Sequence, residues 1–130
     1  MSWLFVALAA CLSVGDEVPE DEFAEAFAPL FCAREAECAK GLYQSLYFDR
    51  SDCVAHWEQA LADQLDTFDD FGCSYDAGEA ADAFDTIKDM SCEDYYEGDD
   101  LADLSADIWA DCSSYGYTTS YYGYYTYYDY

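Results

Sequence analysis

Cysteine is the residue type that most constrains the fold of this chain. Seven cysteines occur in 130 residues, and six of them are spread along the chain at intervals of 6 to 20 positions: Cys32, Cys38, Cys53, Cys73, Cys92 and Cys112. No two cysteines form a C-x-x-C pair, so zinc ribbons and thioredoxin-like redox sites are disfavoured. Six separated cysteines in a domain of about 100 residues are typical of three disulfides formed in an oxidising compartment.

The seventh cysteine, Cys11, ends an uncharged opening stretch, MSWLFVALAAC. The apolar run at 3–12 is shorter than the roughly 20 residues of a membrane-spanning helix and has the length of a signal-peptide apolar region. Ser13 and Gly15 allow a cut before Asp16, whereas LAAC resembles the bacterial lipobox, in which the cysteine is lipidated and becomes the new N-terminus. The first two residues supply no lysine or arginine, and the alternative is a buried first helix of a cytosolic protein.

Either processing route takes Cys11 out of the pool of pairing cysteines, by lipidation or by removal. We therefore expect residues 1–15 to be a signal peptide, lipobox-like up to Cys11 or cut before Asp16. The mature protein is then extracytoplasmic, either a lipoprotein anchored in the outer membrane or a secreted protein.

The charge of the chain excludes several partners. Aspartate and glutamate number 29 against four lysines and arginines, which gives a formal net charge of −25. Nucleic acid is excluded because phosphate contacts need a positive surface. Direct adhesion to anionic lipid is disfavoured for the same reason, which leaves a lipid on Cys11 as the route to a membrane. The acidic surface is expected to bind divalent cations weakly and without a specific site.

Three regions follow the signal: an acidic linker at 16–22, a helical disulfide domain at 20–113 and a tyrosine-rich tail at 114–130. The predicted fold is all-α, a small disulfide-stapled bundle of about four helices. The first helix is expected from residue 20 to about 48, the second from about 51 to 71, the third from about 76 to 90 and the fourth from about 99 onward. Their apolar faces repeat with helical spacing, most regularly in the second helix: Val54, Trp57, Leu61, Leu65 and Phe68.

Local signals fix several helix boundaries. Ser51 and Asp52 are able to cap the second helix, and Asp76 with Glu79 has the spacing of a capping box at the start of the third. Pro29 lies inside the first helix and predicts a kink or a late start. Gly41 is a weak point in the same helix.

The tail has the composition of a low-complexity segment. Tyrosine fills nine of the last sixteen positions, with glycine, serine and threonine between them. Such sequence is usually disordered and able to self-associate through stacking and β-pairing. The tail is therefore expected either to contact matrix or other copies of the protein, or to be a solvated segment with no selected role.

Chemistry-bearing motifs are weak. His56, with Cys53 and Asp52 one turn earlier, would form a nucleophile–base set on one helix, but Cys53 is expected in a disulfide. Acidic clusters at 66–70 and 93–100 suggest calcium, yet neither matches the calcium-loop pattern. No phosphate loop, nucleophile elbow or zinc-protease helix is present. We expect no enzymatic activity, no metal site and no cofactor.

Three stretches, FCAREAECAKGLYQSLYFDRSDCVAHWEQAL, CSYDAGEAADAFDTIKDMSCEDYYEGD and IWADC, resemble a loose group of uncharacterised exported bacterial proteins. These are cysteine-containing helical proteins, often lipoproteins, and the resemblance covers roughly residues 23–112. It implies a fold and an extracytoplasmic address, without an activity. Members often carry a further cysteine pair where this chain has Ala83 or Phe84 and Ser105.

The disulfide pairing is predicted from depth in an up-and-down bundle whose first helix runs to about Phe48. Each helical residue rises 1.5 Å, and bridged Cα atoms must approach within about 7 Å. Matching depths predicts Cys53–Cys92, Cys38–Cys112 and Cys32–Cys73. If the first helix ended at Gly41 instead, Cys38–Cys53 would become the natural local pair.

Two functions follow from the sequence. The first is a non-catalytic exported or lipid-anchored cell-envelope protein with a structural or interaction role. The alternative is a soluble extracytoplasmic module that binds a cation or a small ligand.

Overall fold

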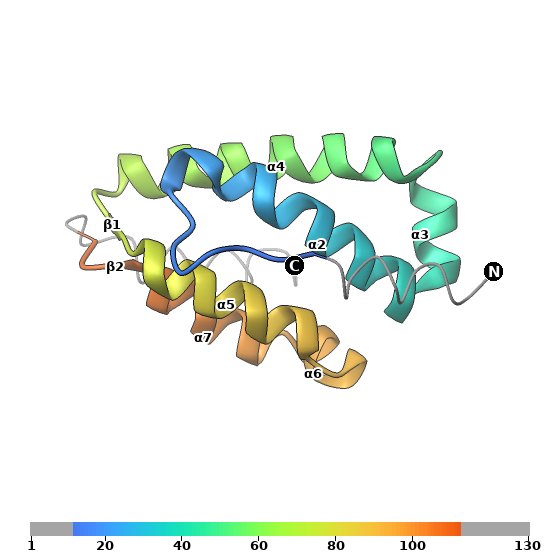
Figure 1. The fold of residues 1–130 in the computed structure, drawn as a ribbon. Helices are drawn as coiled ribbons and strands as arrows, with labels where there is room; N and C mark the ends of the chain where they lie inside the picture. Colours follow the sequence, from blue (N-terminus) through green and yellow to red (C-terminus); the bar gives the residue numbers. More distant parts are fainter. Residues whose placement is uncertain (1–11, 113–130) are drawn as a thin grey trace, which may run out of the picture.

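Residues 12–112 are described by a computed structural model of the chain (Figure 1). The elements in order are the 3-10 turn η1 (Glu20–Glu22), α2 (Phe23–Cys38), α3 (Lys40–Leu46), α4 (Arg50–Asp70), β1 (Ser74–Tyr75), α5 (Ala77–Asp89), α6 (Cys92–Glu97), α7 (Asp99–Ile108) and β2 (Trp109–Ala110). The predicted all-α class is confirmed. Of the predicted signal peptide at 1–15, residues 1–11, which include Cys11, lie outside the described residues, and so does the predicted tyrosine-rich tail at 114–130.

Helices α4 and α5 form where local signals place them. The Asp76 carboxylate accepts a hydrogen bond from the Glu79 backbone N–H at 3.0 Å, as the capping-box spacing predicts. Helix α4 begins slightly before the expected Ser51, because Asp49 is its N-cap and accepts from the Asp52 N–H at 2.8 Å. The Asp52 carboxylate in turn accepts from the Phe48 N–H at 2.9 Å.

The predicted first helix is two helices. The first of the two, α2, continues through Pro29 and ends at Cys38, because the Ala39 backbone leaves the helical region with φ −138° and ψ 55°. The break turns α3 away from the axis of α2 (Figure 1), and it buries Tyr43 against the Cys32 and Cys53 side chains. Two leucines of α3 are exposed as a result, Leu42 at 58% and Leu46 at 59%, although the single predicted helix to about Phe48 would continue the face of α2 through them.

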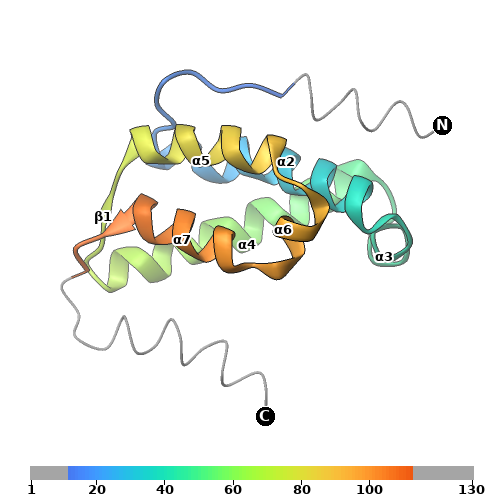
Figure 2. The same cartoon turned by 90° about the horizontal axis from the view of Figure 1, so that it is seen from below.

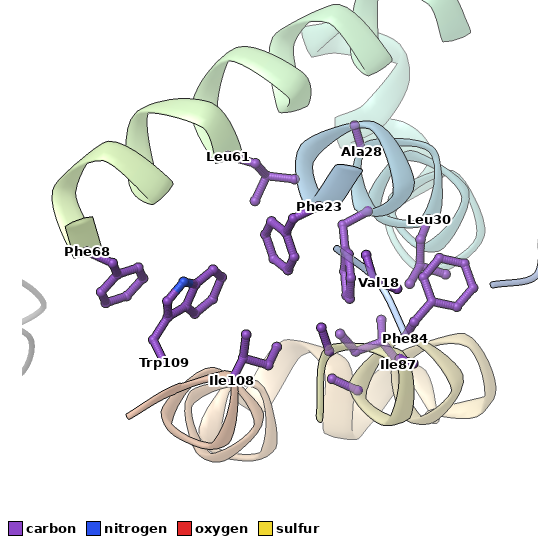
Figure 3. Close-up of a cluster of buried hydrophobic side chains, with 14 of the residues drawn as sticks. Val18, Phe23, Ala28, Leu30, Leu61, Phe68, Phe84, Ile87, Ile108 and Trp109 are labelled. Atoms are coloured by element: carbon purple, nitrogen blue, oxygen red, sulfur yellow. The ribbon is translucent and has the colours of Figure 1, made fainter. Parts of the chain in front are cut away.

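Helix α2 is the centre of the fold. It packs on α4 along one side and on α5 along the other, while α5 also packs on α7. Figure 1 shows α4 on one side of α2, and α5, α6 and α7 on the other. Aromatic side chains dominate the core, and the ring of Trp109 lies between those of Phe23 and Phe68 (Figure 3). Helix α6 lies between the predicted third and fourth helices, where no helix was predicted, and it buries Tyr95.

The chain ahead of η1 packs on the domain. Val18 is buried, its N–H donates to the Ala77 carbonyl at 3.0 Å, and its carbonyl accepts from the Tyr75 hydroxyl at 2.6 Å. The Lys88 ammonium donates to the Leu12 carbonyl at 3.3 Å. Residues 12–18 thus form a strap along α5 (Figure 2), although residues 16–22 have the composition of a linker.

All six expected cysteines are disulfide-bonded, but the predicted pairs Cys53–Cys92, Cys38–Cys112 and Cys32–Cys73 are wrong. The bonds are Cys32–Cys53, Cys38–Cys92 and Cys73–Cys112. The depth argument assumed one straight helix to Phe48. Because the helix breaks at Ala39, α4 begins beside the last turns of α2 and Cys53 meets Cys32.

The other two bonds depend on α6 and on the strand pair β1–β2, which the sequence did not predict. Helix α6 starts where α5 returns to the end of α2, so Cys92 meets Cys38. Cys73 and Cys112 flank β1 and β2, which pair antiparallel with Ser74 opposite Ala110. The alternative pair Cys38–Cys53 is also wrong, since the break at Ala39 brings Cys53 to Cys32 instead.

Candidate ligand-binding cavity

Asp52, Cys53 and His56 do not form the nucleophile–base set that their spacing suggested. The Cys53 sulfur is bonded to Cys32 and is not a nucleophile. Asp52 lies in the first turn of α4, and its carboxylate accepts a hydrogen bond from the Phe48 backbone N–H. His56 is exposed on α4, with its ring 5.6 Å from that of Tyr47 and 6.1 Å from that of Trp57, centroid to centroid.

The acidic clusters do not form a metal site. Among residues 12–112, no group of three or more histidine, cysteine, aspartate or glutamate side chains is placed to hold a metal ion. Over the same residues, no helix has the length and apolar character needed to cross a membrane. The surface clusters therefore offer no site with a defined geometry.

A cavity of about 250 Å³ lies among α2, α4, α6 and α7. Helix α2 packs on α4, and α7 packs on α5, so the cavity occupies the region between these two packed pairs. Figure 3 shows α4 and α7 on opposite sides of this region, with Leu61 and Ile108 directed into it. The polar and aromatic part of the lining includes Phe31, Glu35, Trp57, Tyr95, Ser105 and Trp109.

One end of the cavity is lined by three rings from three helices. Phe31 of α2 lies in the middle, with its centroid 4.9 Å from that of Trp57 on α4 and 6.5 Å from that of Tyr95 on α6. Glu35 lies one turn after Phe31 on the same helix and lines the same space. We call Phe31, Trp57, Tyr95 and Glu35 the aromatic box.

Three buried polar atoms in the cavity lining have no hydrogen-bond partner among the described residues: Trp57 Nε1, Ser105 Oγ and Trp109 Nε1. The fourth such atom in this part of the chain, Arg34 Nε, belongs to a residue outside the lining. A buried donor without a partner costs about 1–3 kcal/mol. Three of them around one cavity are explained if a ligand or ordered water accepts their hydrogen bonds.

Glu35 is the carboxylate of the cavity lining. Burial raises its pKa above the ordinary value, because the charged form loses water. The polar groups of Tyr47 and Trp57 and the charge of His56 act in the opposite direction. The Trp57 indole favours the charged carboxylate, although its N–H is not aligned into a hydrogen bond with it.

The disulfides fix the aromatic box. Cys32 follows Phe31 and is bonded to Cys53, one turn before Trp57. The second bond, Cys38–Cys92, ties the end of α2 to the first residue of α6, which carries Tyr95. Each wall of the box is therefore cross-linked to α2 within a few residues of its ring.

The third disulfide holds the other end of the cavity. Cys112 lies three residues after Trp109, and its bond to Cys73 fastens β2 to the segment after α4. The cavity was not predicted, because helical spacing indicates which residues face a partner helix and carries no information on gaps between helices. The one sequence signal is the repeated closeness of a cysteine to an aromatic residue, as in Phe31-Cys32 and Trp109 with Cys112.

Comparison with known proteins gives no match to a protein-family model, to a curated protein or to a solved structure.

Proposed function

We propose that this chain is a non-catalytic extracytoplasmic protein that binds a small ligand in the cavity between α2, α4, α6 and α7. The observation that carries the proposal is the set of unpartnered polar atoms in the lining, Trp57 Nε1, Ser105 Oγ and Trp109 Nε1. Ligand sites are typically apolar and aromatic with a few polar groups that fix orientation. Cross-links on either side of the cavity keep it open without a bound ligand, which lowers the entropy cost of binding.

The test uses benzyl alcohol, which has one apolar ring and one acceptor oxygen. Titration into ¹⁵N-labelled, disulfide-intact protein is expected to shift the indole N–H signals of Trp57 and Trp109 in a saturable manner. The variant Ala102→Phe, which fills the lining from α7, should abolish the shifts. Ala106→Phe on the exposed face of α7 is the matched control and should leave them unchanged.

Two results would count against a binding cavity. One is the absence of any saturable shift at the Trp57 and Trp109 signals of the unmodified protein. The other is equal binding by Ala102→Phe and Ala106→Phe, with both variants retaining the helical circular dichroism of the parent.

For the location, the proposal is a lipoprotein anchored through Cys11 in the outer membrane. Three disulfides fit an oxidising compartment outside the cytoplasm. The strap supports the lipobox route, because a cut before Asp16 would remove Leu12 and Val14, which pack against the core. Mass spectrometry of the mature N-terminus tests this: a diacylglyceryl group on Cys11 is expected, and an unmodified Asp16 would contradict it.

A second candidate function, contact with another macromolecule of the envelope, is favoured by the apolar surface of α3. Leu42 and Leu46 of α3 are exposed, and Phe48, two residues after the end of α3, is 94% exposed. The tyrosine-rich tail is proposed to contribute to the same kind of contact. Analytical ultracentrifugation of the parent and of Phe48→Ser tests self-association; sedimentation as a monomer in both would argue against association between copies.

A further inference from the structure

The aromatic box has the composition of a site for an organic cation. The faces of tryptophan, tyrosine and phenylalanine rings attract a cation within about 6 Å, and the attraction strengthens when water is excluded. Here the Phe31 ring centroid lies 4.9 Å from that of Trp57 and 6.5 Å from that of Tyr95, and all three residues line the same cavity. Tyr95 already lies beside one cation, since the Arg34 guanidinium carbon is 5.8 Å from its ring centroid.

The charges around the box favour the same ligand. Glu35 supplies a carboxylate to the lining, and the whole chain carries a formal charge of −25, which concentrates cations and repels anions. Arg34 is the opposing charge. Its guanidinium is paired with Glu37 at 2.7 Å and donates to the Met90 carbonyl, so its charge is largely compensated.

The ligand must also carry an acceptor. The Trp57 N–H and the Ser105 hydroxyl are buried without partners in this lining and are able to donate to a hydroxyl or carbonyl oxygen. A metal ion is disfavoured, because calcium takes six to eight oxygen ligands and the lining supplies one carboxylate. The cavity, at about 250 Å³, is smaller than a drug-sized pocket of roughly 300–1,000 Å³.

We infer that the cavity binds a small substituted-ammonium ligand with one hydroxyl or carbonyl oxygen, whose cationic group lies in the aromatic box beside Glu35. This inference rests on the proposed function, since it assigns the ligand class of the same cavity. The Phe31, Trp57 and Tyr95 rings contact the methyl or methylene groups around the nitrogen. Trp57 Nε1 and Ser105 Oγ donate to the ligand oxygen.

The test compares choline with 3,3-dimethylbutan-1-ol, which has the same shape with carbon in place of the charged nitrogen. Both are titrated at constant ionic strength into the ¹⁵N-labelled mature chain, and the indole signals of Trp57 and Trp109 are followed. Choline is expected to bind at least about tenfold more tightly, since cation–π contacts and a carboxylate act on the charged ligand alone.

The variant Glu35→Gln should lower the affinity for choline, while the cation–π contacts keep it above that for the neutral alcohol, and should leave binding of the alcohol unaffected. Glu25→Gln removes the same charge from an exposed position of α2 and should leave choline binding nearly unchanged. Equal affinity for choline and its neutral isostere would overturn the inference, as would equal losses in Glu35→Gln and Glu25→Gln.

The benzyl alcohol titration separates the two proposals. If benzyl alcohol binds and Ala102→Phe prevents it, a failure of choline overturns the ligand class alone. If neither compound shifts the indole signals, the binding cavity fails together with its ligand class.

Discussion

At the scale of single residues, α2 holds two neighbouring charged side chains in different ways. Arg34 is 4% exposed and satisfies its charge within the protein, through Glu37 and the Met90 carbonyl. Glu35 is half-buried, and its pKa is raised mainly because burial removes water from the carboxylate. A buried charge without a full set of partners costs stability and is often kept for a binding role.

Glu35→Gln is expected to stabilise the unliganded protein near neutral pH. With a raised pKa in the folded state, Glu35 binds a proton more readily when folded than when unfolded. Its contribution to the free energy of unfolding is fully present below the unfolded pKa of about 4.3 and is lost as pH rises through the folded pKa. Relative to the parent, the variant should therefore gain stability between about pH 5 and about pH 7.5.

Urea unfolding of parent, Glu35→Gln and Glu25→Gln at these two pH values provides the measurement. Glu25→Gln controls for the general relief of negative charge. Neighbouring groups of Tyr47, His56 and Trp57 act on Glu35 in the opposite direction from burial. A smaller gain in Glu35→Gln than in Glu25→Gln at the higher pH would show that these neighbours outweigh burial.

At the scale of elements, two glycines at helix boundaries have opposite conformational demands. Gly41 lies in the first turn of α3, and a Cβ built there would meet open space. Gly98 separates α6 from α7 with φ +79°, in the left-handed region that other residues rarely adopt. The same substitution should therefore have opposite effects at the two positions.

Gly41→Ala is expected to raise the free energy of unfolding by about 0.5 kcal/mol, because alanine loses less backbone entropy on entering a helix. Gly98→Ala should lower it by about 1 kcal/mol, because the side chain strains the left-handed backbone. Guanidinium unfolding of both variants measures the difference. A stabilising effect at Gly98 would mean that this boundary relaxes out of the left-handed region.

The disulfides are the second feature at this scale. Cys38–Cys92 closes a loop of 54 residues, and Cys73–Cys112 closes one of 39. Replacing either pair by alanine is expected to lower the free energy of unfolding by about 4 kcal/mol in the chain-entropy model. Denaturant unfolding with the other two bonds intact measures this loss, and non-reducing peptide mapping checks the pairing. A loss below about 1 kcal/mol would show that the unfolded chain keeps those ends together.

At the scale of the whole molecule, charge repulsion opposes the cross-links and the aromatic core. All four basic residues of the chain lie within residues 12–112, yet the one side-chain ion pair closer than 4 Å in this range is Arg34–Glu37. The remaining acidic groups repel one another across the surface of the domain. The strap along α5 and the three disulfides hold the domain together against this repulsion.

Added salt is therefore expected to raise the melting temperature. Screening acts within about 10 Å at 0.1 M ionic strength, so most of the gain should occur between about 0.01 and 0.5 M sodium chloride. Differential scanning calorimetry at neutral pH measures it. A melting temperature independent of salt over this range would mean that repulsion between surface charges does not limit stability.

The sequence by itself determined the features that depend on neighbours within one helical turn. The apolar spacing from Val54 to Phe68 set the face of α4, and the Asp76–Glu79 spacing set the start of α5. The cysteine content predicted that six residues would be bonded. Periodicity, capping and composition act locally, so they are readable without a fold.

Tertiary structure decided which cysteines meet and where the cavity lies. The break at Ala39 is favoured because Tyr43 then packs on the Cys32–Cys53 bond, a contact between three separate segments. That one change of direction shifts α4 along α2, so the positions of the cysteines along the bundle axis differ from those assumed in the predicted pairing. The aromatic box likewise exists because Phe31, Trp57 and Tyr95 converge from three helices. Such positions depend on how distant segments pack, and helical periodicity carries no information about it.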